Sequence, residues 1–212
     1  MKFKAVFFDW DLTLVNSLKA NKMAYRAICK EVGEKPTEKG FKRFVGSSVT
    51  KNVDYFYSRR RKTYKGTKLK LRNVLKGAFM KHLNTIKVYD AKVLRDLKKM
   101  KMKIAIITGN AESIVRATAK KHKMPYDALF GDEHRKGRDK VWAIRQLLKR
   151  FKLKKKDVVY VGDHPNDIKQ AHKAGIKVLI TPSGGVYSRD FLKKFHPDFY
   201  CANLKCVERT VK

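Results

Sequence analysis

Short apolar segments alternate with amphipathic segments along most of this 212-residue chain. Aromatic and β-branched side chains fill four stretches with the length of a buried strand, at residues 3–8, 103–108, 157–163 and 177–181. Apolar spacing typical of helices lies between them, over residues 93–101, 111–122, 139–151 and 166–175. This alternation predicts an α/β fold, with a parallel sheet covered by helices on both faces. The tail, residues 195–212, is expected to add an edge strand and a short helix.

One segment interrupts the alternation directly after the first predicted strand. A helix is expected to begin at Asn16-Ser17 and to end at Gly33, and the following pattern is irregular, aromatic and very basic. Short helices are expected there, with breaks near Pro36, Gly46, Gly66 and Gly77. The sequence therefore predicts a core domain of residues 1–17 and 86–212, with a mainly helical module inserted at 18–85.

Composition limits the class of protein. The apolar fraction of 43% is ordinary for a globular chain, and no run approaches the ~20 apolar residues of a membrane span. The opening MKFKAVFFD has too short an apolar run for a signal peptide, so a cytoplasmic location is expected. Three cysteines without a CxxC pair predict reduced, structural thiols and no zinc site.

The charge is unusual. Lys and Arg total 52 against 19 Asp and Glu, a formal net charge of +33. Such a surface attracts phosphate-bearing molecules and nucleic acid, although it also fits a host proteome adapted to unusual salt or temperature. Residues 59–72 hold eight basic residues and no acid, near Tyr57 and Tyr64. They form either a solvated cationic surface or a platform for a polyanionic ligand.

Polar side chains gather where the predicted strands end. Asp9 and Asp11 follow the first strand, and the corresponding residues after later strands are Thr108, Gly109, Asn110, Asp163 and Asp167. The carboxyl ends of parallel strands meet at one edge, which is where open α/β sheets bind ligands. A divalent cation would make such crowded carboxylates tolerable. Lys140 opens a helix between two of these blocks and is the preferred candidate for the catalytic lysine. Lys136, which lies nearby, is the alternative.

Four segments in this order, DWDLT, ITGN, the lysine of KVWAI and VGDHPND, resemble the haloacid dehalogenase (HAD) superfamily of phosphohydrolases over nearly the whole chain. The resemblance implies a Rossmann-like three-layer core with a parallel sheet and an inserted α-helical cap, as in the phosphoglycolate phosphatase-like branch. It also implies Mg²⁺-dependent hydrolysis of a small phosphorylated metabolite through an aspartyl-phosphate. No membrane partner is expected, because no apolar run is long enough to span a bilayer.

The resemblance assigns a role to each block. Asp9 would be the nucleophile. Asp11 would protonate the leaving oxygen, activate water and lend its backbone carbonyl to the metal. Asp163 and Asp167 would complete the metal site. The predicted phosphate ligands are Thr108, Gly109, Asn110 and Lys140, together with amides of the loop after Asp9.

Two departures and several alternatives remain. Leu12 stands where the family usually has Gly, and His164 where it usually has Ser or Thr. Asp11 favours phosphate-ester hydrolysis over dehalogenation, because halide leaves without a proton. A nucleotide or polynucleotide phosphatase using the basic cap is the alternative enzyme. The non-enzymatic alternatives are a phosphoacceptor receiver domain, which lacks a cap after its first strand, and a nucleic-acid-binding protein on an inactive core.

Overall fold

The computed structural model describes residues 2–212 and divides the chain into two compact units. The sheet unit comprises Met1–Asn16 and Val88–Lys212, and the helical unit comprises Ser17–Lys87. The domain boundaries expected from the sequence lie within one or two residues of these limits. That the helical unit acts as a cap stays a prediction.

Six parallel strands form the sheet of the first unit in the order β5-β4-β1-β6-β7-β8. Their bounds are β1 Ala5–Phe8, β4 Lys103–Ile107, β5 Ala128–Phe130, β6 Val158–Gly162, β7 Lys177–Ile180 and β8 Phe199–Tyr200. A separate pair, β2 (Val15–Asn16) with β3 (Lys87–Val88), lies where the chain leaves and re-enters this unit. The predicted α/β class with a parallel sheet is confirmed.

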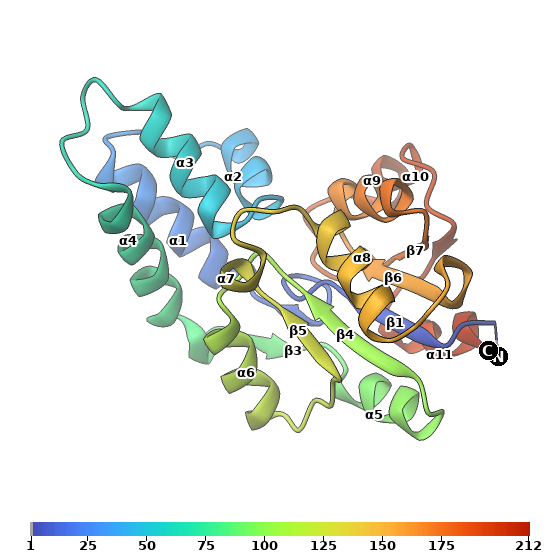
Figure 1. Cartoon of the computed structure of the whole chain (residues 1–212). Coiled ribbons are helices and arrows are strands. Elements are labelled where there is room, and N and C mark those ends of the chain that lie inside the picture. Colours follow the sequence, from blue (N-terminus) through green and yellow to red (C-terminus); the bar gives the residue numbers. More distant parts are fainter. Residues whose placement is uncertain (1) are drawn as a thin grey trace. The chain divides into compact units, whose positions relative to one another are not determined.

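Helices cover both faces of this sheet (Figure 1). Their bounds are α5 Ala91–Lys99, α6 Glu112–Lys121, α7 Asp132–Arg135, α8 Lys140–Arg150, α9 Pro165–Ala174, α10 Arg189–Lys193 and α11 Val207–Val211, with 3-10 turns at Lys155–Asp157 and Leu204–Cys206. Ala5 and Phe7 of β1 belong to the apolar core under α8 and α9. The alternate residues Val6 and Phe8 are equally buried, because both faces are covered. The predicted tail, an edge strand followed by a short helix, is also present as β8 and α11.

The helical unit contains α1 (Leu18–Glu31), α2 (Glu38–Val45), α3 (Val49–Arg59), α4 (Lys68–Met80) and a 3-10 turn at Leu83–Thr85. The Tyr25 ring lies 5.4–6.3 Å from the rings of Phe41, Phe44 and Phe56, so aromatic contacts join three of the helices. The predicted break near Gly77 is wrong, because α4 continues through it. Burial of one helical stripe, Leu71, Leu75 and Phe79, outweighs the weak helix propensity of glycine.

The prediction of three reduced thiols is also wrong. The sulfurs of Cys201 and Cys206 are joined, with their Cα atoms 5.9 Å apart, whereas Cys29 is free and buried. The turn between β8 and α11 brings the two sulfurs together across five residues, a separation that the sequence alone did not distinguish from that of two free thiols. Only the folded chain therefore identifies this pair.

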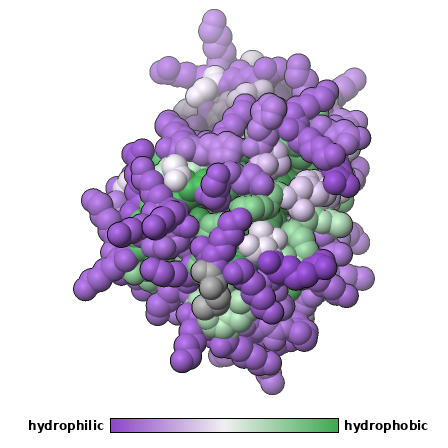
Figure 2. Space-filling model, turned by 90° about the vertical axis from the view of Figure 1, so that its right-hand side faces the viewer, coloured by the Kyte–Doolittle hydropathy of each residue, from purple (hydrophilic) through white to green (hydrophobic). Residues whose placement is uncertain are grey.

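The surface is dominated by polar side chains. On the face shown in Figure 2, hydrophilic residues cover most of the area, and apolar residues are visible between them. Within residues 2–212, no helix combines the length and the apolar character needed to cross a bilayer. The cytoplasmic location stays a prediction.

Candidate active site

The loop after β1 folds tightly over the end of the sheet. Asp9 donates its backbone N–H to the Val161 carbonyl at 2.9 Å, which extends the ladder between β1 and β6 by one residue. Leu12 then adopts a left-handed conformation with φ of +62°. A side chain at such a φ carries a steric cost that glycine avoids. Leu12 is nevertheless buried, so apolar contact offsets part of the cost of replacing the family's usual glycine.

Three buried carboxylates meet at this edge of the sheet. Asp9, Asp163 and Asp167 each place one oxygen within 4.8 Å of the others. Asp167 lies in the first turn of α9, and its Oδ2 accepts hydrogen bonds from the backbone N–H groups of Asp163 and His164 at 3.3 and 3.2 Å. Gly162 makes this position possible, because a Cβ there would collide with the Asp167 carboxylate.

Lys140 bridges two of these carboxylates. Its Nζ lies 2.8 Å from Asp9 Oδ1 and 2.7 Å from Asp167 Oδ1, and its side chain is 12% exposed. The same Nζ also donates a hydrogen bond to the Tyr160 hydroxyl at 2.9 Å. The helix that carries Lys140 is positioned by its N-cap Asp139, which accepts from the Trp142 N–H at 3.0 Å.

The charges at this edge do not balance. Three carboxylates face one ammonium group, and burial raises the pKa of Asp9 to about 7, although Lys140 opposes the shift. Burial, followed by repulsion from Asp9 and Asp167, raises the pKa of Asp163 well above its ordinary value. Burial disfavours the charged form of Lys140, but Asp167 and Asp9 outweigh it and keep its pKa well above 10.5. The cluster is therefore short of positive charge.

Asp11 is directed toward a different strand end. Its carboxylate accepts from Asn110 Nδ2 at 3.3 and 3.4 Å, and the Thr108 hydroxyl lies 3.5 Å away. Thr108 is fully buried, and its Oγ1 accepts from the Asn110 N–H at 3.0 Å. The end of β4 thus supplies the hydrogen-bond donors of Asp11, while the charge of Asp11 still helps to raise the pKa of Asp9. The predicted metal ligand of Asp11 was its backbone carbonyl, and that assignment stays a prediction.

The structure brings most of the predicted residues to one edge and adds two that the sequence interpretation missed. The Thr13 hydroxyl donates to Asp163 Oδ1 at 2.8 Å, and Tyr160 contacts Lys140. The Thr of DWDLT was a visible signal for the first, but no pattern marks a buried strand tyrosine as a partner of a lysine. Lys136, the rival of Lys140, is an exposed residue with a left-handed backbone at the end of α7.

His164 lies at the rim of this site as the N-cap of α9. Its Nδ1 accepts from the Asn166 N–H at 3.0 Å, and its Nε2 lies 3.2 Å from the Tyr187 hydroxyl. The Tyr187 ring meets the imidazole edge-on, with centroids 5.0 Å apart. Both ring nitrogens of His164 are therefore occupied, which favours a structural role over contact with a ligand.

The donor set fits a hard divalent cation. Its side-chain donors are all carboxylate oxygens, and Mg²⁺ prefers oxygen ligands to nitrogen or sulfur. An added cation would supply the missing positive charge and lower the raised pKa values of Asp9 and Asp163. Asp9, Asp163 and Asp167 are thus the residues able to hold Mg²⁺.

Comparison with known sequences gives a match over most of the chain. A family model described as haloacid dehalogenase-like hydrolase matches residues 6–181. A relative from Caldanaerobacter subterraneus subsp. tengcongensis, provisionally named pyrophosphatase PpaX, is 25% identical over 224 residues, with 100% of this chain and 96% of the relative covered.

Solved structures share the fold at low identity. A predicted phosphoglycolate phosphatase from Haemophilus somnus has a TM-score of 0.80 at 21% identity and covers 100% of this chain and 99% of its own. A hydrolase from Pseudomonas syringae reaches a TM-score of 0.83 at 16% identity, with coverage of 98% and 97%. A β-phosphoglucomutase from Clostridium difficile has a TM-score of 0.80 at 14% identity, and the match covers 97% of this chain and 93% of the mutase chain. Since these names cover different reactions, the shared fold leaves the substrate open.

Proposed function

Because the chain belongs to the haloacid dehalogenase-like hydrolase family, as its motifs indicated, we propose that it is a Mg²⁺-dependent phosphatase acting on a small phosphate monoester. The observation that carries this proposal is the buried cluster of Asp9, Asp163 and Asp167 bridged by Lys140. When bound there, Mg²⁺ would screen the charge of the phosphoryl group from the attacking carboxylate.

The proposed first step uses Asp9 and Asp11. Lys140 occupies Asp9 Oδ1, which leaves Oδ2 as the oxygen to attack phosphorus. A bond forms between this oxygen and phosphorus while the bond from phosphorus to the leaving oxygen breaks. Asp11 gives its proton to the leaving alcohol. Its hydrogen bonds with Thr108 and Asn110, and its position outside the cluster of Asp9, Asp163 and Asp167, support this role.

The second step regenerates Asp9. Asp11, now ionised, takes a proton from a water molecule that attacks the aspartyl-phosphate, and inorganic phosphate leaves. Lys140 and the N–H groups after Thr108 would stabilise charge on the phosphoryl oxygens in both steps. Thr13 and Tyr160 act as positioning residues for Asp163 and Lys140.

The main alternative, a nucleotide or polynucleotide phosphatase, depended on the basic segment 59–72. Four of its eight basic residues pair with carboxylates of the same unit: Arg59 and Arg60 with Glu34, Lys68 with Asp54, and Lys70 with Glu31. These pairs explain part of the segment without a ligand, and we therefore favour the small monoester. The family match likewise disfavours a receiver domain.

The test is release of phosphate from para-nitrophenyl phosphate with Mg²⁺ and with EDTA. We expect turnover with Mg²⁺, its loss in EDTA, and a phosphoryl group recovered on the peptide that contains Asp9 after rapid quenching. Undiminished turnover in EDTA would exclude the proposed metal dependence. A panel of phosphoglycolate, sugar phosphates, nucleotides, 3′-phosphorylated oligonucleotides and pyrophosphate would then define the substrate. Pyrophosphate is included because of the relative's name.

A further inference from the structure

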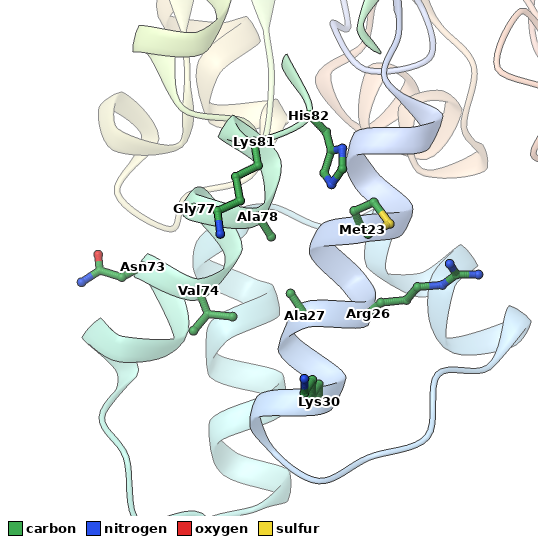
Figure 3. A pocket seen from close by; sticks show the side chains of 10 residues that line it. All are labelled: Met23, Arg26, Ala27, Lys30, Asn73, Val74, Gly77, Ala78, Lys81 and His82. Atoms are coloured by element: carbon green, nitrogen blue, oxygen red, sulfur yellow. The ribbon is translucent and has the colours of Figure 1, made fainter. Parts of the chain in front are cut away.

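A groove runs between α1 and α4 on the surface of the helical unit (Figure 3). Its volume is about 500 Å³. Val74 and Ala78 of α4 point toward Ala27 of α1 across the space between the two helices, and they form an apolar floor (Figure 3). Gly77 widens the groove, because a Cβ on it would meet no heavy atom within 4 Å.

This floor adjoins the buried stripe of α4, because Val74 and Ala78 follow Leu71 by three and seven residues and therefore lie on the same face of the helix. Val74 and Ala78 are only half-buried, whereas Leu71, Leu75 and Phe79 of this face are buried. A helix that only covers a core presents apolar residues on one face. The incompletely covered edge of the apolar face of α4 therefore offers a surface that another apolar group can cover.

Cations surround this floor. Arg26 and Lys30 line it from α1, while Lys81 and His82 line it from the end of α4. None of the groove's lining residues in the described chain is acidic. Within residues 2–212, Arg26, Lys30 and Lys81 form no ion pair, in contrast to Lys68 and Lys70 on the first turn of α4.

We propose that this α1–α4 groove binds an acidic, amphipathic helical segment of a partner protein. One or two apolar side chains would occupy the floor over Gly77, and flanking carboxylates would face Arg26, Lys30 and Lys81. The floor and its rim from Val74 to Lys81 span about 11 Å of α4, the length that two helical turns of a partner cover. A second copy of this chain is a poorer occupant, because it would oppose cations to cations.

The probe is a fluorescein-labelled 14-residue peptide with leucines at helical spacing i, i+3, i+4, i+7 and glutamates elsewhere. Its control replaces every leucine with serine at unchanged charge, because any acidic peptide is attracted by a net charge of +33. Fluorescence anisotropy in 150 mM salt should give at least about tenfold tighter binding of the leucine peptide. Equal binding of the two peptides would overturn the proposal.

Matched variants locate the site. Gly77→Leu fills the groove and should weaken binding of the leucine peptide about tenfold, whereas Gly77→Ala adds only a methyl group and should leave binding within threefold. Both should melt no lower than the wild type, because glycine is the weaker helix former. Full binding by folded Gly77→Leu would exclude this groove.

Charge reversal distinguishes attraction of the peptide by the basic residues around the groove from attraction by the positive charge of the whole protein. Arg26→Glu with Lys30→Glu should weaken binding at least about tenfold, and Lys62→Glu with Lys65→Glu, which changes the net charge equally, less than threefold. Equal loss in both doubles would leave only non-specific attraction. Sedimentation equilibrium should give a monomer of 24.6 kDa, and a dimer that Gly77→Leu dissociates would assign the groove to a second copy instead.

Discussion

At the two edges of the parallel sheet, the pKa values of carboxyl groups shift in opposite directions. At the carboxyl edge, Asp9 and Asp163 have raised pKa values because they are buried beside each other and Asp167. At the amino edge, Asp127 and Asp198 have lowered pKa values, although burial alone would raise them. The residue type and the sheet are the same, so the difference comes from the partners.

The amino edge supplies each carboxylate with its own donors. Asp198 accepts from Lys177 Nζ at 2.6 Å and from the N–H of Val178, the second residue of β7, at 3.0 Å. Asp127 accepts from Lys98 Nζ at 2.8 Å and from the N–H of Ile104, the second residue of β4, at 2.7 Å. These carboxylates are satisfied within the protein, whereas the carboxyl edge concentrates negative charge that a bound cation can complete.

The largest expected effect comes from removing the proposed nucleophile. Asp9→Asn should lower kcat for para-nitrophenyl phosphate at least about 10³-fold, because an amide does not attack phosphorus. It should not lower the melting temperature, since it removes one of three crowded carboxylates. Asp198→Asn at the opposite edge is the matched control and should keep wild-type kcat. Turnover within tenfold of wild type would remove Asp9 from this role.

Removal of the bridging ammonium group of Lys140 should give the next largest effect. Lys140→Met leaves three carboxylates without the ammonium group between them and should lower the free energy of unfolding by about 3 kcal/mol at pH 8 in EDTA. Saturating Mg²⁺ should restore most of this loss. Lys177→Met at the amino edge should cost about 1 kcal/mol with no dependence on Mg²⁺. Urea unfolding measures both free energies. If Mg²⁺ does not restore the unfolding free energy lost in Lys140→Met, the assignment of the cluster as a metal site is contradicted.

Metal binding itself should stabilise the folded protein. At a Mg²⁺ concentration 100 times the Kd, the expected gain in unfolding free energy is about 2.7 kcal/mol. Asp163→Asn should lose most of this gain, while Asp127→Asn should retain all of it. Thermal melts with Mg²⁺ and with EDTA measure the difference. Equal gains in the two variants would place the bound metal elsewhere.

The smallest expected effect concerns the amino edge. The lowered pKa of Asp198 means that its contribution is present above the ordinary value of 3.8 and is lost as the pH falls toward the folded-state pKa. Asp198→Asn should therefore lower the free energy of unfolding by about 1–2 kcal/mol at pH 7, and by less at pH 3.5. Urea unfolding at the two pH values tests this, and a cost that grows at low pH would contradict it.

The strands, and the polar residues that directly follow them, were predictable because both depend on the local sequence pattern. A buried parallel strand is a short apolar run, and residues directly after several such runs must meet at one edge. Asp9, Thr108 and Asp163 were found in this way, as was the tail that forms β8 and α11. The chain by itself therefore determined the fold class and the edge that carries the acidic cluster.

Other features depend on residues that only folding brings together. Lys136 and Lys140 both lie near the start of α8, and only the three-dimensional path of the chain places Lys140 between Asp9 and Asp167. Thr13 and Tyr160 acquire partners across 150 and 20 residues of sequence.

Local propensity failed where tertiary packing overrode it. Gly77 weakens a helix by about 1 kcal/mol, but burial of Leu71, Leu75 and Phe79 on the same helix outweighs that cost. The sulfurs of Cys201 and Cys206 likewise meet only through the turn after β8. The sequence by itself determined what each segment buries, and the tertiary structure decided which side chains meet, because contact depends on distances in space that sequence spacing does not contain.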